Sequence, residues 1–273
     1  MTISRGHGGC LVSDAVVRAA VDAARAAGRA ILPHYRRLLA VTSKVDGSPL
    51  TAADRAAHEA IEAVLAATGV PLVSEEGSDL KLGLTRYWLV DPLDGTKDFL
   101  AGNDEFTVNV ALVEGDRVVF GVVYAPATDS LWSGGVGHPP QATTPAGLRP
   151  AVCAPASPGL RVAVSRFHDH PDVGLFAEQN LAVERVPRGS ALKYCQLADA
   201  EVDVFPRLVG CSEWDTAAGQ AILEATGGQV LDWHTGDPLR YGKPGRRNPR
   251  LLSFRAPYTR DSFHSSVYSP ELL

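Results

Sequence analysis

The residues with the clearest chemistry are Asp91-Pro92-Leu93-Asp94-Gly95-Thr96, which directly follow the aromatic and β-branched run at 86–90. A run of that kind predicts a buried strand. Two carboxylates are therefore expected close together where the strand ends, in a turn shaped by a rigid proline and a permissive glycine. Carboxylates held so close repel each other unless a cation lies between them. Mg²⁺ takes such oxygen ligands and often substrate phosphates as well. Alone, the motif would also fit an acidic turn that caps the next helix.

Two further acidic positions stand at the ends of predicted elements. Glu75 and Glu76 follow a short strand predicted over 70–73, and Asp215 lies near the start of a helix predicted over 213–226. Because each lies beside regular structure, each can be held rigidly, and together the three positions could form a cage for two or three metal ions. Taken alone, Asp215 would also be explained as a charge that complements a helix dipole.

Together, these positions resemble the signatures of the inositol monophosphatase superfamily of Mg²⁺-dependent, lithium-sensitive phosphatases. The matching segments, in the family's order and approximate spacing, are Ser74-Glu75-Glu76, residues 91–96, and Trp214-Asp215-Thr216-Ala217-Ala218-Gly219. Within the superfamily the chain is most similar to the bacterial 3'(2'),5'-bisphosphate nucleotidases of the CysQ type, through residues 97–99, 105–109, 121–126, 189–195 and 205–207. The resemblance runs from about residue 12 to about residue 254. It implies an α/β (α+β) protein built as a layered αβαβα sandwich, with a metal site between two lobes.

The resemblance implies that two or three Mg²⁺ ions bind to the acidic motifs. The implied metal ligands are Glu75, Glu76, Asp91, Asp94, Asp215 and the backbone carbonyl of Leu93. Asp91 would bridge the two principal ions, which in such sites lie ~3.5–4 Å apart and bind both the attacking and the leaving oxygen. Glu76 would hold a third, weaker ion or its water, or would be a solvated surface acid.

For catalysis, the resemblance implies that Thr96 and Asp54 orient and help to deprotonate the attacking water, beside Glu75. A threonine hydroxyl can donate and accept at once, and a carboxylate can take the proton. Asp54 has a second explanation, because Thr51 and Asp54 have the spacing of a helix capping box. Lys44 would contact the water network or be an ordinary solvated lysine.

For the substrate, the resemblance implies contacts from the acidic loop and from the second half of the chain. The implied residues are Gly95, Thr96, His168, Ser190, Lys193, Arg207 and Asp215. The Gly95 and Thr96 amides would face a phosphate at a helix N-terminus, and Arg207 would add a planar cation suited to phosphate. Simpler explanations remain: Ser190 as a helix cap, Lys193 and Arg207 as surface charges, and His168 as a loop residue.

The activity expected from the resemblance is Mg²⁺-dependent removal of the 3'-phosphate from 3'-phosphoadenosine 5'-phosphate, giving AMP, with a role in sulfur metabolism. An inositol monophosphatase or a sugar bisphosphatase would use the same metal site. A covalent aspartyl-phosphate mechanism of the haloacid dehalogenase type is disfavoured because Asp91 and Asp94 are one residue too far apart for that motif. A catalytically silent nucleotide sensor is disfavoured because the acid set is complete.

Composition restricts the function classes further. The chain has 273 residues with 45% hydrophobic and 21% charged residues, ordinary values for a soluble globular protein. Its net charge of −5 disfavours nonspecific nucleic-acid binding. The cysteines are scattered and form no Cys-x-x-Cys pair, and no apolar run approaches the ~20 residues of a membrane span. We therefore expect a cytoplasmic monomer or homodimer, with loose membrane association as the alternative, that acts on a bisphosphorylated nucleotide and not on nucleic acid.

The elements that must position these residues fall into two predicted lobes. Helical periodicity over 13–39 and 51–68 precedes the strands at 86–91, 106–113 and 118–124, whereas strands and helices alternate from 161 to 226. Alternation of that kind predicts a sheet covered by helices. The predicted divisions are an N-terminal extension (1–12), an α+β lobe (13–140), a Pro-rich connection (141–159), an α/β lobe (160–256) and a tail (257–273).

Overall fold

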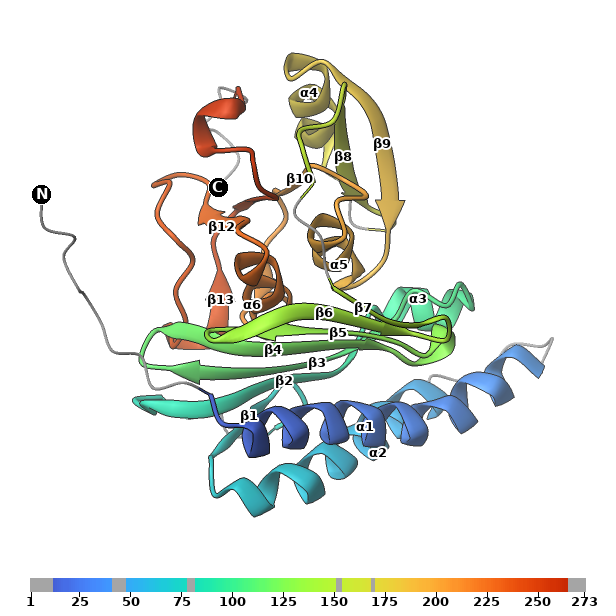
Figure 1. Cartoon of the computed structure of the whole chain (residues 1–273). Coiled ribbons are helices and arrows are strands. Elements are labelled where there is room, and N and C mark those ends of the chain that lie inside the picture. Colours follow the sequence, from blue (N-terminus) through green and yellow to red (C-terminus); the bar gives the residue numbers. More distant parts are fainter. Residues whose placement is uncertain (1–11, 41–47, 78–81, 151–153, 168–169, 265–273) are drawn as a thin grey trace, which may run out of the picture.

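The computed structural model describes residues 12–40, 48–77, 82–150, 154–167 and 170–264. The outermost layer is a pair of helices, α1 (Asp14–Ala40) and α2 (Ser48–Leu65), which pack on each other and cover one face of the first sheet (Figure 1). Alanines and Ile31 on α1 and Ile61 on α2 are fully buried in this interface. Among the described residues, none of the helices combines the length and the apolar character that crossing a membrane requires.

The first sheet has seven strands in sequence order. Its strands are β1 (Leu72–Ser74), β2 (Arg86–Asp94), β3 (Thr107–Glu114), β4 (Arg117–Ala125), β5 (Ser130–Gly135), β6 (His138–Thr144) and β7 (Gly147–Pro150). Strand β1 is parallel to β2, and every later pair is antiparallel. The central strands are buried on both faces because helices cover them from both sides.

Helices α5 (Leu192–Ala198) and α6 (Ala217–Ala225) form the middle layer between the two sheets (Figure 1). Helix α6 packs on β4 and β5. The approach depends on Gly121 of β4, where a Cβ atom would lie 2.4 Å from the backbone oxygen of Ala218. A real Cβ could not be accommodated there, so the missing side chain is what allows the helix to rest on the strand.

The second sheet has the strand order β12-β14-β10-β8-β9. Its strands are β8 (Leu160–Ser165), β9 (Ala182–Arg188), β10 (Val204–Arg207), β12 (Gln229–Asp232) and β14 (Leu251–Phe254). Helix α4 (Pro171–Gln179) packs beside β9 and β10, and β11 (Cys211–Ser212) pairs separately with β13 (Arg247–Asn248). The layers therefore follow the expected αβαβα order. Short helices complete the described chain: α3 (Thr96–Ala101) and the 3-10 turns η1 (Ala66–Thr68), η2 (Pro126–Thr128), η3 (Pro244–Arg246) and η4 (Arg260–Ser262).

The Pro-rich connection predicted over 141–159 is wrong in its first part, because that part contains the end of β6 and the whole of β7. Both strands extend the first sheet. Pro139 and Pro140 do not interrupt β6, because they fall in the irregular register between the Gly135–His138 and Ser133–Gln141 pairs with β5. A residue without an N–H is tolerated at such a bulge.

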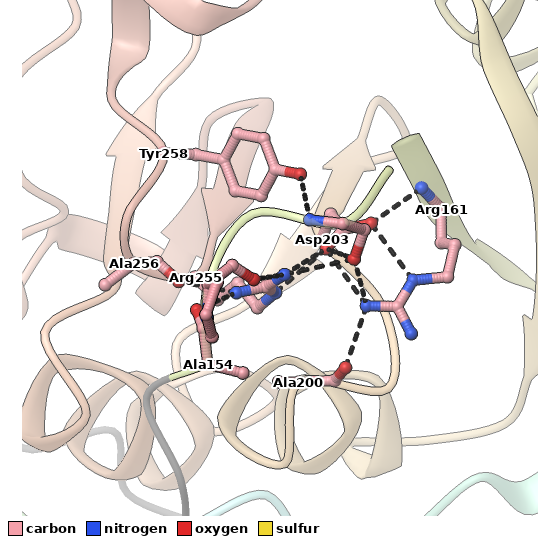
Figure 2. Close-up of polar contacts among 9 residues, drawn as sticks. Ala154, Arg161, Ala200, Asp203, Arg255, Ala256 and Tyr258 are labelled. Carbon is pink, nitrogen blue, oxygen red and sulfur yellow. Dashed lines mark hydrogen bonds and ion pairs between the residues drawn. The ribbon is translucent and has the colours of Figure 1, made fainter. Parts of the chain in front are cut away.

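The tail predicted from residue 257 onward is also packed as far as His264. Phe263 is 5% exposed and contacts the rings of Phe176, Phe254 and Tyr258. Just before it, Arg255 donates to the buried carboxylate of Asp203 and to the carbonyls of Ala154 and Pro155. Figure 2 shows this Asp203 network, in which Arg161 of β8 donates to the same carboxylate through Nε at 3.1 Å and its backbone N–H at 2.8 Å. The network fastens the end of the described chain to the second sheet.

Candidate active site

The acidic motif lies within the end of β2, so the strand does not stop at Asp91. Asp91 pairs with Asn109 of β3 and Asp94 pairs with Thr107, with an irregular register between them. Pro92 falls in this irregularity, where its missing N–H removes no ladder hydrogen bond. The Asp91 side chain is held by its own turn, because its Oδ1 accepts the Leu93 N–H at 3.1 Å. Gly95 follows with φ of 90°, a left-handed conformation that favours glycine.

A cavity of about 420 Å³ opens at this strand end. Five carboxylates line it: those of Glu75, Asp91, Asp94, Asp98 and Asp215, of which all but Asp98 belong to the acid set predicted from the sequence. Glu75 follows the end of β1, Asp91 and Asp94 lie at the end of β2, Asp98 lies in α3, and Asp215 lies in the turn before α6. Residues predicted from the sequence that line the same cavity are Leu93, Gly95, Thr96, Ser190, Lys193 and Arg207. The fold thus brings together motifs that are up to about 140 residues apart in the chain.

Burial and mutual repulsion make the carboxylates reluctant to ionise together. Asp91 is 2% exposed, and burial together with Asp94, Glu75 and Asp215 raises its pKa well above the usual range. Desolvation by the surrounding protein, followed by the charges of Asp215 and Asp94, raises the pKa of Glu75 to about 7. Burial also raises the pKa of Asp215, although Arg207 opposes that shift. The site therefore carries negative charge that its own cations compensate only in part.

The donor set fits a hard divalent cation. Carboxylate and carbonyl oxygens are the ligands that Mg²⁺ and similar ions prefer, and a bound cation removes the repulsion between the acids. In the described residues, no three acidic, histidine or cysteine side chains already meet as a finished metal site. Two of the acids accept hydrogen bonds from neighbouring side chains: Asp215 from Arg207 at 3.1 Å, and Asp94 from the Asn109 amide at 3.1 Å.

Asp54 and Glu76 lie near the acid set but do not line the cavity. Burial raises the pKa of Asp54 to about 7, with further contributions from the charges of Glu76 and Glu75. A carboxyl group with this pKa exchanges its proton near neutral pH, which suits a general base. Asp54 sits in the second turn of α2, where its side chain is half-buried. Asp54 is therefore not an ordinary solvated acid on a helix surface, because it is half-buried beside other carboxylates.

The cationic residues come from the second half of the chain. Lys193, at the start of α5, is 3% exposed, so it is not the surface charge of the simpler explanation. Burial and the nearby Arg207 lower its pKa to about 8. Its Nζ donates to the carbonyls of Arg188 at 3.0 Å and Ser190 at 2.8 Å. Ser190 has φ of 46°, and its Oγ is buried with no hydrogen-bond partner among the described residues. It precedes α5 but makes no side-chain cap, since the cap residue is Ala191.

A model of the inositol monophosphatase family matches residues 13–255. The chain belongs to this family. The 3'(2'),5'-bisphosphate nucleotidase CysQ of Escherichia coli (strain K12) is 40% identical over 226 residues, which cover 80% of this chain and 90% of that protein. The CysQ of Buchnera aphidicola is 35% identical and covers 89% of this chain and 91% of its own length.

Solved structures show the same relationship. The crystal structure of CysQ from Bacteroides thetaiotaomicron, a bacterial member of the family, has a TM-score of 0.79 and 35% identity, and it covers 87% of this chain and 96% of its own. An inositol monophosphatase from Anabaena has a TM-score of 0.70 and 25% identity, covering 87% and 89%. The fold class is therefore confirmed, and the chain is a phosphatase that hydrolyses phosphoric monoesters.

Several residues that contact the acids or line the cavity were not predicted from the sequence as site residues. Asn109 and Thr107 of β3 donate to Asp94 at 3.1 and 3.4 Å and so orient it. Their segment was noted only as a subgroup marker, although polar side chains inside an apolar strand were a usable signal. Arg247 and Phe167 line the cavity from distant parts of the chain, and no local pattern marked them.

His168 and Lys44 lie outside the described residues, and the side chain of Thr51 is not described either. The expected roles of His168 and Lys44, and the capping-box explanation of Asp54, stay predictions.

Proposed function

We propose that this phosphatase removes the 3'-phosphate of 3'-phosphoadenosine 5'-phosphate, giving AMP and inorganic phosphate, and that it requires Mg²⁺. The observation that carries the proposal is that one cavity is lined both by carboxylates and by cations. The carboxylates of the predicted acid set come from β1, β2 and the turn before α6, and the cations come from α5 and β10. A substrate with two phosphates matches such a cavity, because one phosphate is cleaved beside the acids while the other pairs with the cations. The relatives named CysQ carry the same activity in their names.

The metal would be held by Glu75, Asp91, Asp94, Asp215 and the Leu93 carbonyl. Glu76, whose charge helps to raise the Asp54 pKa, would hold a third ion or its water. When bound, Mg²⁺ supplies positive charge for the phosphate oxygens and favours ionisation of a nearby water. Asp91 would be the central ligand of such a site, because it is the most buried member of the set and interacts with the other three acids.

The chain's own residues orient the water and the substrate. Thr96 is exposed at the cavity wall as the first residue of α3, where its hydroxyl can hold a water molecule. Asp54, with a pKa near 7, can accept the proton that this water loses. In the same cavity, Lys193 and Arg207 offer ammonium and guanidinium donors to the phosphate that is not cleaved, and the Ser190 hydroxyl, which has no hydrogen-bond partner among the described residues, offers one more.

The test is phosphate release by purified protein with 3'-phosphoadenosine 5'-phosphate, inositol 1-phosphate and fructose 1,6-bisphosphate, compared as kcat/KM in Mg²⁺ and after metal removal. We expect preference for the nucleotide, loss of activity without metal, and near-complete loss in Asp94→Asn and Asp215→Asn. Asp116→Asn is the control, because Asp116 is 60% exposed and pairs only with Arg240 among its described contacts to side chains. A preference for inositol phosphate would overturn the substrate while leaving the phosphatase assignment intact.

A further inference from the structure

One buried carboxylate, Glu105, connects the acidic half of the site to the half that carries Ser190 and Lys193. Glu105 lies between α3 and β3 and is 7% exposed. Arg166, directly after β8, donates to it through two nitrogens, Nε to Oε2 at 2.8 Å and Nη2 to Oε1 at 2.7 Å. A paired arrangement of this kind is the strongest arginine–carboxylate geometry. It ties the end of β8 in the second sheet to the start of β3 in the first.

The same carboxylate holds the end of β9. Arg188 Nη1 donates to Oε1 at 3.1 Å, and the Gly189 N–H donates to Oε2 at 2.7 Å. Although burial opposes it, hydrogen bonds from Arg166 and Gly189 lower the pKa of Glu105, so the carboxylate is ionised at neutral pH. We call Glu105, Arg166, Arg188 and Gly189 the Glu105 clamp. Its two cations and one amide satisfy both carboxylate oxygens.

The Glu105 clamp fixes the atoms that in turn fix Lys193. The Lys193 Nζ donates to the carbonyls of Arg188 and Ser190, which flank the glycine whose N–H the carboxylate holds. Ser190 itself is in a left-handed conformation that a non-glycine residue adopts only under constraint. A shift of Gly189 would therefore move the Ser190 hydroxyl and the Lys193 ammonium together.

The clamped segment also rests directly on the acidic half of the site. A Cβ on Gly189 would lie 2.4 Å from the carboxyl carbon of Asp98, and a Cβ on Gly95 would lie 3.1 Å from the Ser190 Cβ. Gly95 and Asp98 belong to the start of α3, immediately after the metal-binding motif. The distance between the acidic motif and the Lys193 ammonium is thus set by close packing on one side and by the Glu105 clamp on the other.

We propose that Glu105 is a positioning residue for the substrate's second phosphate: it touches no substrate atom, but it holds Ser190 and Lys193 at the correct separation from the acidic motif. This inference rests on the proposed function, because only a substrate with a second phosphate needs that separation. Glu105→Gln keeps the size of the side chain and removes its charge, which loosens Arg166 and Arg188. Misplacement of a binding group by about 1 Å can cost up to about a hundredfold.

The experiment compares 3'-phosphoadenosine 5'-phosphate with adenosine 3'-phosphate, which lacks the second phosphate, in wild type and Glu105→Gln with saturating Mg²⁺. We expect the KM for the bisphosphate to rise about ten- to a hundredfold, with kcat changed little, because loss of uniform binding raises KM alone. The kcat/KM for adenosine 3'-phosphate should stay nearly constant. Arg188→Met provides a second variant in case Glu105→Gln does not fold. Arg188 is 36% exposed, and its replacement removes only one of the hydrogen bonds to Glu105.

Asp203→Asn is the matched control. Asp203 is also a buried carboxylate held by two arginines and a backbone N–H, and the Asp203 network of Figure 2 does not line the cavity. The Asp203→Asn variant should be less stable than wild type but keep the wild-type ratio of kcat/KM for 3'-phosphoadenosine 5'-phosphate to kcat/KM for adenosine 3'-phosphate. If Glu105→Gln, or Arg188→Met in its place, leaves that ratio unchanged, the role of Glu105 is purely structural and the inference is wrong. If the wild type itself fails to favour the bisphosphate, the proposed function fails and the inference fails with it.

Discussion

Replacing Asp91 with asparagine tests whether this acid cluster exists to hold a cation. Asp91 is 2% exposed, and its neighbours are other carboxylates that raise its pKa well above the usual range. Without metal, an ionised Asp91 therefore opposes folding. Asparagine has nearly the same volume, and its Oδ1 can still accept the Leu93 N–H that Asp91 now accepts at 3.1 Å. We expect Asp91→Asn to make the metal-free protein more stable while abolishing its activity.

The size of the effect follows from the burial. An uncompensated buried charge typically costs about 3–5 kcal/mol, but Asp91 can relieve part of this by binding a proton. A gain of about 1–3 kcal/mol in the unfolding free energy is therefore reasonable. For a chain of this size, ~1 kcal/mol corresponds to roughly 2–4 °C in Tm. Wild type should gain about 2.7 kcal/mol when Mg²⁺ is present at about 100 times its Kd, and Asp91→Asn should gain almost none of it.

Thermal unfolding of both proteins in excess EDTA and in saturating Mg²⁺ measures all these quantities. The expected order inverts: the variant is the more stable protein in EDTA, and it loses that advantage in Mg²⁺. Asp116→Asn removes the same formal charge from an exposed turn and should change Tm little in either condition. A variant that is less stable than wild type in EDTA and still responds fully to Mg²⁺ would refute the reasoning.

Two further predictions concern the framework. Asp203 is fully buried, and hydrogen bonds from Arg161 and Arg255 keep it ionised. Asp203→Asn should therefore lower the unfolding free energy by about 3–5 kcal/mol, measured by urea titration at neutral pH. Despite its burial, hydrogen bonds from Arg161 and Arg255 lower the Asp203 pKa. The stability that the ionised Asp203 contributes is therefore fully present above the ordinary Asp pKa of about 3.9, and it is lost as pH falls through the lowered pKa. The deficit of the variant should therefore shrink in acid, and a constant deficit would contradict the linkage. In α6, a Cβ on Gly219 would lie 2.5 Å from the Tyr194 ring, so Gly219→Ala should cost about 1–3 kcal/mol by thermal unfolding and lower kcat by moving Asp215; unchanged stability and kcat would show that the ring moves aside freely.

The parts of the fold that the sequence predicted well are those with a strong internal period. Helices α1 and α2 and strands β2 to β4 carry long apolar patterns that are buried in the structure. Strands β6 and β7 were missed because prolines and small polar residues dominate them, and their pairing comes from β5 and not from their own propensity. Strands β12 and β14 are only four residues each, too short to show a period against their surroundings.

The site divides in the same way between local and tertiary information. The acids were predictable because each stands beside a strand or helix end, so a short motif identifies it. Cavity contacts such as Arg247, and the partners of Glu105, depend on tertiary packing: Arg166 and Arg188 are 61 and 83 residues away from Glu105 in sequence. No local pattern could have paired them, since exposed arginines after strands are common and only the fold decides which carboxylate they meet.

The position of Asp215 explains why metal binding and folding should be coupled in this protein. The other acids share one sheet, but Asp215 precedes α6, whose place depends on the contact of Ala218 with Gly121 in the first sheet and of Gly219 with Tyr194 of α5. The carboxylate set is therefore complete only when the middle layer is packed against the first sheet. A cation that draws Asp215 and Asp91 together must stabilise that packing, because binding to the folded state alone shifts the folding equilibrium. Conversely, any change that loosens α6 should weaken metal affinity even where every ligand is intact.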